Sequence, residues 1–203
     1  GFQRRVKGRT RGNNRKIAPL TMLDRFVDAL TEATRKLTVG PALTGAFDQG
    51  PLIDAKAVDK VEELIADATA MGASVSVGGE RDALGATFFR PTVLCDVPKS
   101  ARIAKEEIFG PVAPVFRFSD EQEAIDMAND TEFGLASYLF TQDLSRAIRV
   151  AEAIESGMVG VNSGIISTEL APFGGVKESG LGREGSSYGL EDYTELKYLC
   201  LSI

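Results

Sequence analysis

The sequence predicts an α/β fold in which a largely parallel sheet is flanked by helices. Helix and strand patterns alternate along the chain, and the clearest stretch, residues 112–161, has the order strand–helix–strand–helix–strand. This order implies right-handed crossovers and a parallel sheet with helices packed against it. The composition agrees, because 43% hydrophobic and 26% charged residues in a chain of 203 are typical of one large or two small folded domains.

Apolar residues at helical spacing predict two helices near the start of the chain. The first ends at Gly40, and the second begins after a turn and ends at Gly72. Two strands follow, at residues 73–77 and 88–97, and Pro91 places the latter at a sheet edge or in an irregular position. The inward faces are Phe26, Ala29, Leu30, Ala33 and Leu37 in the first helix and Val58, Val61, Leu64, Ile65 and Ala68 in the second.

The 112–161 stretch provides the clearest elements. Strands are predicted at residues 112–118, 136–141 and 158–161, the last of them short, apolar and typical of a buried strand. Helices are predicted at residues 120–129 and after Asp143, whose side chain can cap the helix N-terminus. The inward residues are Ala124, Ile125 and Ala128 in the first of these helices and Leu144, Ala147, Ile148, Ala151 and Ile154 in the second.

Beyond this stretch the pattern changes. Residues 163–189 contain seven glycines and no periodicity, which is typical of a functional loop or a disordered segment. Residues 193–203 alternate and become apolar, which predicts a terminal strand. Such a strand needs a partner edge, either in this subunit or in another one.

Charge is unevenly distributed along the chain. Residues 1–16 carry seven basic side chains and no acidic one, whereas the other 187 residues have a net charge of −13. Nucleic acid or a membrane surface attracts basic arms, but the acidic remainder repels phosphate at long range. We therefore expect a solvated tail and no nucleic-acid partner. No apolar run approaches eighteen residues, so we expect no membrane partner either.

The composition also excludes several chemistries. Histidine is absent, so the chain holds no Ser-His-Asp or Cys-His mechanism. Two cysteines without histidine do not make a typical structural zinc site, and we predict no metal site. Cys95 and Cys200 form no disulfide framework, fit a reducing, cytoplasmic compartment and are both expected to be buried structural thiols.

The glycine-rich loop at residues 173–184 has two interpretations. Glycine clusters bind phosphate in some nucleotide-binding loops. Here, however, no Lys-Ser/Thr pair closes the loop at a helix start, and no strand leads into the spacing of a dinucleotide fingerprint. The glycines therefore favour a structural role, in which they permit positive φ angles and close backbone approach.

A second candidate site is the run KEEIFGPV at residues 105–112. Glu106 and Glu107 are adjacent and cannot both face one site, so they do not act as an acid–base pair. Two interpretations are open. The carboxylates are solvated at a helix end, or one of them accepts hydrogen bonds from ribose hydroxyls beside an aromatic stacking surface.

Four motifs, in this order, resemble the aldehyde dehydrogenase superfamily. The resemblance covers about residues 22–203, and residues 164–198 are most similar to the succinate-semialdehyde branch. It implies NAD or NADP as cofactor, a small aldehyde as substrate and a homo-oligomer. The motifs are QGPLI at 49–53, EEIFGPV at 106–112, GMVGVN at 157–162 and PFGGVKESGLGRE at 172–184.

The resemblance further implies that the chain is the C-terminal portion of an enzyme that oxidises a small semialdehyde, with succinic semialdehyde favoured, to the acid. In the family a cysteine thiolate attacks the aldehyde, hydride passes to NAD(P)+, and water hydrolyses the thioester. The chain then divides into an atypical basic arm (residues 1–21), a catalytic-domain portion (22–189) and a terminal oligomerisation strand (190–203).

The family's nucleophile motif has no counterpart here. The family has Gly-Gln-x-Cys shortly before an Asn-Arg pair, whereas this chain has GRTR at residues 8–11 before Asn14 and Arg15. A guanidinium cannot form a thioester, and the family's general-base glutamate and nucleotide-binding domain lie upstream. We therefore expect no catalytic residue in this chain. The basic run fits a truncated gene, a shifted reading frame or an artificial join.

Four site residues follow from the resemblance. Glu107 matches the family glutamate that hydrogen-bonds the nicotinamide ribose, and Phe109 matches the aromatic residue that lies against the nicotinamide ring. Phe173 matches an aromatic residue of the aldehyde tunnel. Ser167 either helps to hold the substrate carboxylate, as in the succinate-semialdehyde branch, or is an ordinary loop serine.

Two alternative functions are open. The chain is a catalytically inactive oligomerisation or interaction fragment, attached through its basic arm, or it is part of a dehydrogenase for another semialdehyde or a hydroxyaldehyde. The residues that distinguish NAD from NADP lie upstream in the family.

Overall fold

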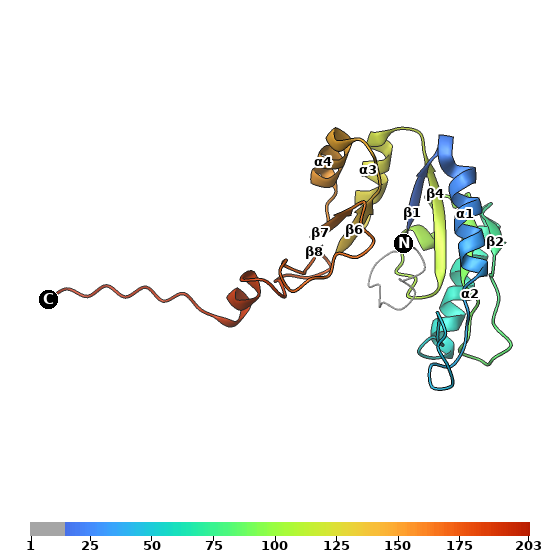
Figure 1. Ribbon diagram of the computed structural model, residues 1–203, viewed down its shortest axis with the longest axis horizontal. Coiled ribbons are helices and arrows are strands. Elements are labelled where there is room, and N and C mark those ends of the chain that lie inside the picture. Colours follow the sequence, from blue (N-terminus) through green and yellow to red (C-terminus); the bar gives the residue numbers. More distant parts are fainter. Residues whose placement is uncertain (1–14) are drawn as a thin grey trace. The chain divides into compact units, whose positions relative to one another are not determined.

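The computed structural model describes residues 15–203, and the predictions for residues 1–14, which hold most of the basic arm, lie outside the described residues. The chain forms two compact units, the first ending at Asp130 and the second beginning at Thr131 (Figure 1). Each unit combines strands with helices, so the predicted α/β class is confirmed.

A four-stranded mixed sheet forms the centre of the first unit. The strands are, in spatial order, β1 (Lys16–Pro19), β4 (Val112–Phe118), β3 (Thr92–Cys95) and β2 (Ser74–Val77). β4 runs parallel to both of its neighbours, whereas β2 runs antiparallel to β3. The sequence predicts no strand at β1, because only Ile17 and Ala18 are apolar there. These two side chains pack against opposite faces of the sheet.

Pro91 predicts that its strand lies at a sheet edge or in an irregular position. The edge position is wrong, whereas the pairing of β3 with β2 is irregular, because its register shifts between Val75 and Val77. Strand β3 begins at Thr92, one residue after the proline, and lies between β4 and β2. All four of its residues are buried. Pro91 therefore stands just outside the ladder, where its missing N–H removes no hydrogen bond between strands.

The described part of the first unit contains the α-helices α1 (Leu23–Arg35), α2 (Ala55–Ala70) and α3 (Glu121–Asn129). Aspartates begin two of them. Asp54 accepts a hydrogen bond from the N–H of Ala57 at 2.8 Å, and Asp120 accepts one from the N–H of Glu123 at 2.9 Å. Such N-caps satisfy backbone donors that have no partner within the helix.

The two faces of the sheet are covered by different helices. Val93 and Cys95 of β3 pack with Leu30 of α1, whereas Leu94, between them, packs with the buried stripe of α2. This alternation follows from the two-residue period of a strand. The predicted stripe of α2 is confirmed, since Val58, Val61, Leu64, Ile65 and Ala68 are all buried.

The second unit contains a smaller α/β element. α4 (Leu144–Ala153) connects the parallel strands β6 (Ala136–Leu139) and β7 (Met158–Val161), and Asp143 caps it as predicted. β5 (Phe133–Gly134) and β8 (Val176–Lys177) form an antiparallel pair. The strands predicted to share one parallel sheet are thus divided, because β4 belongs to the first unit and β6 pairs with β7.

The predicted inward face of α4 is only partly right. Ala147 is buried, but Leu144 and Ile148 are 76% and 56% exposed, and Val150 is buried instead. The apolar residues of α4 form one wide arc on the helix, so their spacing alone does not say which part of the arc packs.

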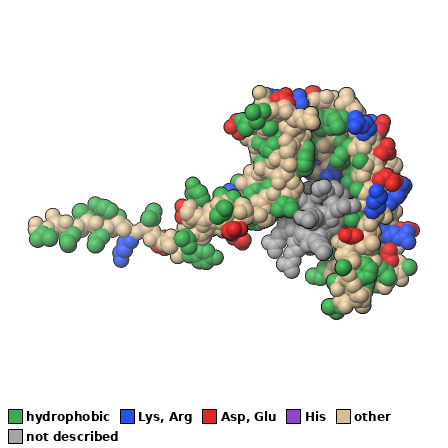
Figure 2. Space-filling view, viewed as in Figure 1, with side chains coloured by type: hydrophobic (Ala, Val, Ile, Leu, Met, Phe, Trp, Pro, Cys, Tyr) green, Lys and Arg blue, Asp and Glu red, His purple; other side chains and the backbone are tan. Residues whose placement is uncertain are grey.

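The chain ends in an extended tail. A short 3-10 helix, η4 (Tyr188–Tyr193), precedes it, and residues 194–203 pair with no strand among the described residues. Leu196, Leu199, Leu201 and Ile203 are at least 77% exposed, and Figure 2 shows apolar side chains along this tail. The terminal strand predicted at residues 193–203 is therefore not formed within the chain itself, because a strand needs a second edge.

In the described part of the chain, no helix has both the length and the apolar character needed to cross a membrane.

Candidate functional site

The first candidate site is a turn that leads into β4. We call residues 105–110 the Glu107 turn. A short 3-10 helix, η3 (Arg102–Ala104), precedes it. Within the turn, Ile108 is buried in the core, Glu107 is half-buried and Phe109 is 52% exposed. The buried isoleucine thus anchors two side chains that reach the surface on either side of it.

The backbone of the Glu107 turn has an unusual shape. Phe109 has a φ of 48°, which is uncommon for a residue with a side chain. At Gly110, a Cβ atom would lie 2.4 Å from Cγ2 of Val61 on α2, so only glycine fits there. The aromatic ring is therefore presented by a backbone that the neighbouring helix holds closely.

The two glutamates of the turn have different surroundings. Glu106 forms an ion pair with Arg102 at 2.7 Å, and this hydrogen bond lowers the pKa of the Glu106 carboxyl. At Glu107 the backbone carbonyl accepts a hydrogen bond from Nζ of Lys60 at 2.6 Å.

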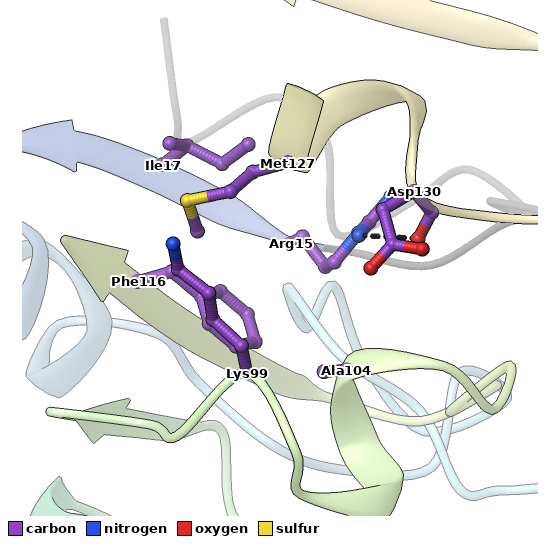
Figure 3. A pocket seen from close by; sticks show the side chains of 7 residues that line it. All are labelled: Arg15, Ile17, Lys99, Ala104, Phe116, Met127 and Asp130. Atoms are coloured by element: carbon purple, nitrogen blue, oxygen red, sulfur yellow. Dashed lines mark hydrogen bonds between the residues drawn. The ribbon is translucent and has the colours of Figure 1, made fainter. Parts of the chain in front are cut away.

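A small, partly open cavity lies in the first unit, beside the C-terminal end of α3 (Figure 3). The Arg15 guanidinium donates to the carbonyls of Ala128 (3.2 Å) and Asp130 (3.1 Å), and burial lowers the pKa of Arg15. The cavity measures about 20 Å³, which is room for one water molecule and no substrate. Its lining residues are Arg15, Ile17, Lys99, Ala104, Phe116, Met127 and Asp130.

The second candidate site is the glycine-rich loop of the second unit. Gly180, Gly182 and Gly185 have positive φ angles of 98°, 82° and 69°. A Cβ on Gly174 would lie 2.5 Å from the carbonyl oxygen of Gly182. These glycines therefore have the structural role expected from the sequence, because they permit positive φ angles and close approach of the backbone. The Arg183 guanidinium fixes the loop further by donating to the carbonyls of Gly175 and Gly182.

The loop forms one side of an open hollow of about 380 Å³. Ser167 and Phe173, the two residues predicted to meet the substrate, both line it. The other lining residues are Thr168, Glu169, Glu184 and Gly185. None of the six is basic, so a carboxylate bound here would need its cations from residues outside this lining.

The two cysteines have different surroundings, and those of Cys95 do not suit a nucleophile. Cys95 is buried in β3, where burial raises the pKa of its thiol and Ser76 lies within hydrogen-bond distance. A raised pKa leaves less of the reactive thiolate. The expectation that both thiols are buried is wrong for Cys200, which is exposed, as are the residues around it in the tail. Residues 15–203 contain no cluster of three potential metal ligands.

The sequence does not reveal the contacts of Lys60 and Arg15. Lys60 lies 47 residues before Glu107, and Arg15 lies 113 residues before Ala128. Both contacts are made to backbone carbonyls, which carry no residue-specific signal. The only sign in the sequence is the position of Lys60 beside the apolar stripe of α2.

Comparison with known proteins gives consistent matches. Residues 11–199 match the aldehyde dehydrogenase family. Glutarate-semialdehyde dehydrogenase of Pseudomonas aeruginosa is 64% identical over 88% of this chain and 37% of its own length. The NADP+-dependent succinate-semialdehyde dehydrogenase of Escherichia coli is 58% identical over 89% of this chain and 37% of its own length.

Solved structures agree with these matches. The crystal structure of succinate-semialdehyde dehydrogenase from Burkholderia pseudomallei superposes with a TM-score of 0.91 at 56% identity. That match covers 94% of this chain and 39% of the solved one. The chain therefore spans little more than a third of the length of the relatives that it matches.

Proposed function

Because the chain belongs to the aldehyde dehydrogenase family, we propose that it is the C-terminal portion of an enzyme that oxidises a small semialdehyde to the acid. Succinic semialdehyde is the favoured substrate, and NAD or NADP is the cofactor. Relatives named as succinate- and glutarate-semialdehyde dehydrogenases, at 58% and 64% identity, support this substrate class.

The observation that carries the proposal is the shape of the Glu107 turn. The residues present fit a nicotinamide nucleotide, because a surface carboxylate stands two residues from a half-exposed aromatic ring on a backbone held by α2. NAD or NADP bound there supplies the hydride acceptor. The Glu107 carboxylate accepts hydrogen bonds from the ribose hydroxyls, and the Phe109 ring lies against the nicotinamide.

The second unit contributes to the aldehyde site in this proposal. Phe173 provides an apolar wall, and the Ser167 hydroxyl donates a hydrogen bond to the substrate carboxylate. That hydrogen bond is neutral and the hollow holds two glutamates, so the charge of the substrate is balanced by residues elsewhere in the enzyme. A substrate with a different polar end fits the hollow of this chain equally well, which leaves other semialdehydes and hydroxyaldehydes as the nearest alternatives.

The proposed enzyme is a homo-oligomer in the cytoplasm. Both cysteines are free thiols, as a reducing compartment favours. The apolar tail, residues 194–203, adds to the sheet of a second copy, in which its backbone finds hydrogen-bonding partners. This tail also supports the alternative function, a non-catalytic fragment that only associates.

A chimera separates the two functions. In it, residues 15–203 replace the matching part of the Pseudomonas aeruginosa relative, which supplies the remaining length. We expect the chimera to reduce NAD or NADP with succinic or glutaric semialdehyde. A chimera that folds and oligomerises but oxidises neither aldehyde would favour the fragment that only associates.

A further inference from the structure

We propose that helix α2 holds the Glu107 turn at two points, the start of η3 just before the turn and the Glu107 carbonyl within it, with Asp67 and Lys60 as the positioning residues. We call these two side chains the α2 clamp. The inference deepens the proposed function and rests on it, because the Glu107 turn carries the two proposed cofactor contacts.

The first end of the clamp is at η3. Oδ2 of Asp67 accepts a hydrogen bond from the backbone N–H of Arg102 at 2.9 Å. Ala101, the residue at the N-cap of η3, has no side-chain oxygen and makes no cap hydrogen bond of its own. Asp67, which lies on α2, therefore does for this short helix what an aspartate at the N-cap position normally does.

Arg102 connects this cap to the Glu107 turn. Its backbone carbonyl accepts the N–H groups of Lys105 and Glu106, at 3.0 and 2.9 Å. Its guanidinium pairs with the Glu106 carboxylate. Fixing Arg102 thus fixes the start of the Glu107 turn and directs Glu106 toward the arginine.

The second end of the clamp is at Glu107 itself. Lys60 donates to the Glu107 carbonyl at 2.6 Å in a partly buried position. A hydrogen bond from an ammonium group is shorter and stronger than a neutral one. It fixes the peptide plane between Glu107 and Ile108, just before the positive φ of Phe109.

The helix that carries both groups is well suited to this role. Asp67 and Lys60 are seven residues apart, close to two helical turns, so they lie on the same side of α2 about 10 Å apart. The adjacent stripe of α2 is buried in the core, and Val61 occupies the space that a Cβ at Gly110 would need. A rigid element therefore sets the distance between Arg102 and Glu107, in a segment that has little regular structure of its own.

The test is amide hydrogen exchange, followed by NMR on the 203-residue chain. Lys60→Met and Asp67→Ala should each speed exchange of residues 103–112 about tenfold, because each removes a hydrogen bond to a charged group. The controls are Lys56→Met and Asp59→Ala on the same helix, which remove charge away from the turn. Exchange in β3 should stay unchanged in all four variants, which excludes general destabilisation.

Conservative variants test the clamp even if Lys60→Met or Asp67→Ala prevents folding. Lys60→Arg retains a charged donor, and Asp67→Asn retains an acceptor, so both should restore slow exchange in large part. Exchange at residues 103–112 that is no faster in Lys60→Met and Asp67→Ala than in the controls would overturn the clamp. Rescue that fails in both conservative variants would overturn it as well.

The chimera distinguishes this inference from the proposed function. There Lys60→Met should raise KM for the cofactor about tenfold while KM for the aldehyde stays within twofold, a split that a merely structural role does not produce. An unchanged rate in Glu107→Gln would contradict the cofactor site. The exchange experiment decides the clamp independently of that result.

Discussion

Phe173 and Glu184 exchange two backbone hydrogen bonds, each 2.7 Å long, and so close the glycine-rich loop into a ring. Both residues line the 380 Å³ hollow, and Phe173 is the proposed aldehyde-facing aromatic residue. The close packing within the ring depends on residues without side chains, because Gly174 lies directly against Gly182.

Gly174→Ala should therefore distort the loop. The added Cβ would lie 2.5 Å from the Gly182 carbonyl oxygen and 2.7 Å from Cδ of Arg183, and overpacking of this kind costs about 1–3 kcal/mol. In the chimera we expect a raised KM for the aldehyde and lower stability in urea. Gly50→Ala is the matched control, since nothing lies within 4 Å of its new Cβ. Equal effects of the two substitutions would contradict the packing argument.

The 203-residue chain should show no aldehyde oxidation. Cys95 is buried with a raised thiol pKa, Cys200 is far along an exposed tail, and the chain contains no histidine. The measurement is NADH and NADPH production from succinic semialdehyde at high protein concentration. Turnover that disappears in Cys95→Ala or Cys200→Ala would refute this prediction.

Deleting residues 194–203 should convert an oligomer into a monomer or an aggregate. The tail is extended, apolar and unpaired within the described chain, and main-chain pairing with a second copy would satisfy its backbone. Light scattering at micromolar concentration measures the change. An intact chain that is already a stable monomer would show that the tail does not add to a partner's sheet under these conditions.

Glu123 should make stability depend on pH in the acidic range. The Lys99 ammonium, with the hydroxyl and backbone N–H of Ser119, lowers the pKa of Glu123 from 4.5 to about 2. Because the folded value is the lower one, this stabilisation is fully present above pH 4.5 and is lost as the pH falls through about 2. Urea unfolding of Glu123→Gln should show a weaker loss of stability with acid, and curves parallel to those of the unchanged chain would rule out the contribution.

The sequence predicts the helices and most strands, because apolar spacing and capping aspartates are local signals. Asp54, Asp120 and Asp143 each cap the helix that follows. It does not predict β1, whose four residues carry little pattern and are stabilised by pairing with β4. Strand order also depends on tertiary contacts. Pro91 therefore suggests an edge position for β3, which lies between β4 and β2.

The candidate site shows the same division between local and distant signals. The sequence motifs predict Glu107, Phe109, Ser167 and Phe173 as site residues by resemblance, and the last two line one hollow. The groups that hold the Glu107 turn cannot be predicted from the sequence, because Lys60 and Asp67 contact backbone atoms 47 and 35 residues away. Such contacts depend on how α2 packs and not on a motif.

The most direct test of the account is the rate of hydride transfer in the chimera carrying Glu107→Gln. Losing a hydrogen bond to a charged group should slow this step roughly ten- to a hundredfold and leave aldehyde binding nearly unchanged. Glu106→Gln is the neighbouring control, and its loss should be smaller because Glu106 pairs with Arg102. A Glu107→Gln rate equal to that of the unchanged chimera, with both NAD and NADP, would contradict the assignment of the Glu107 turn as the cofactor site.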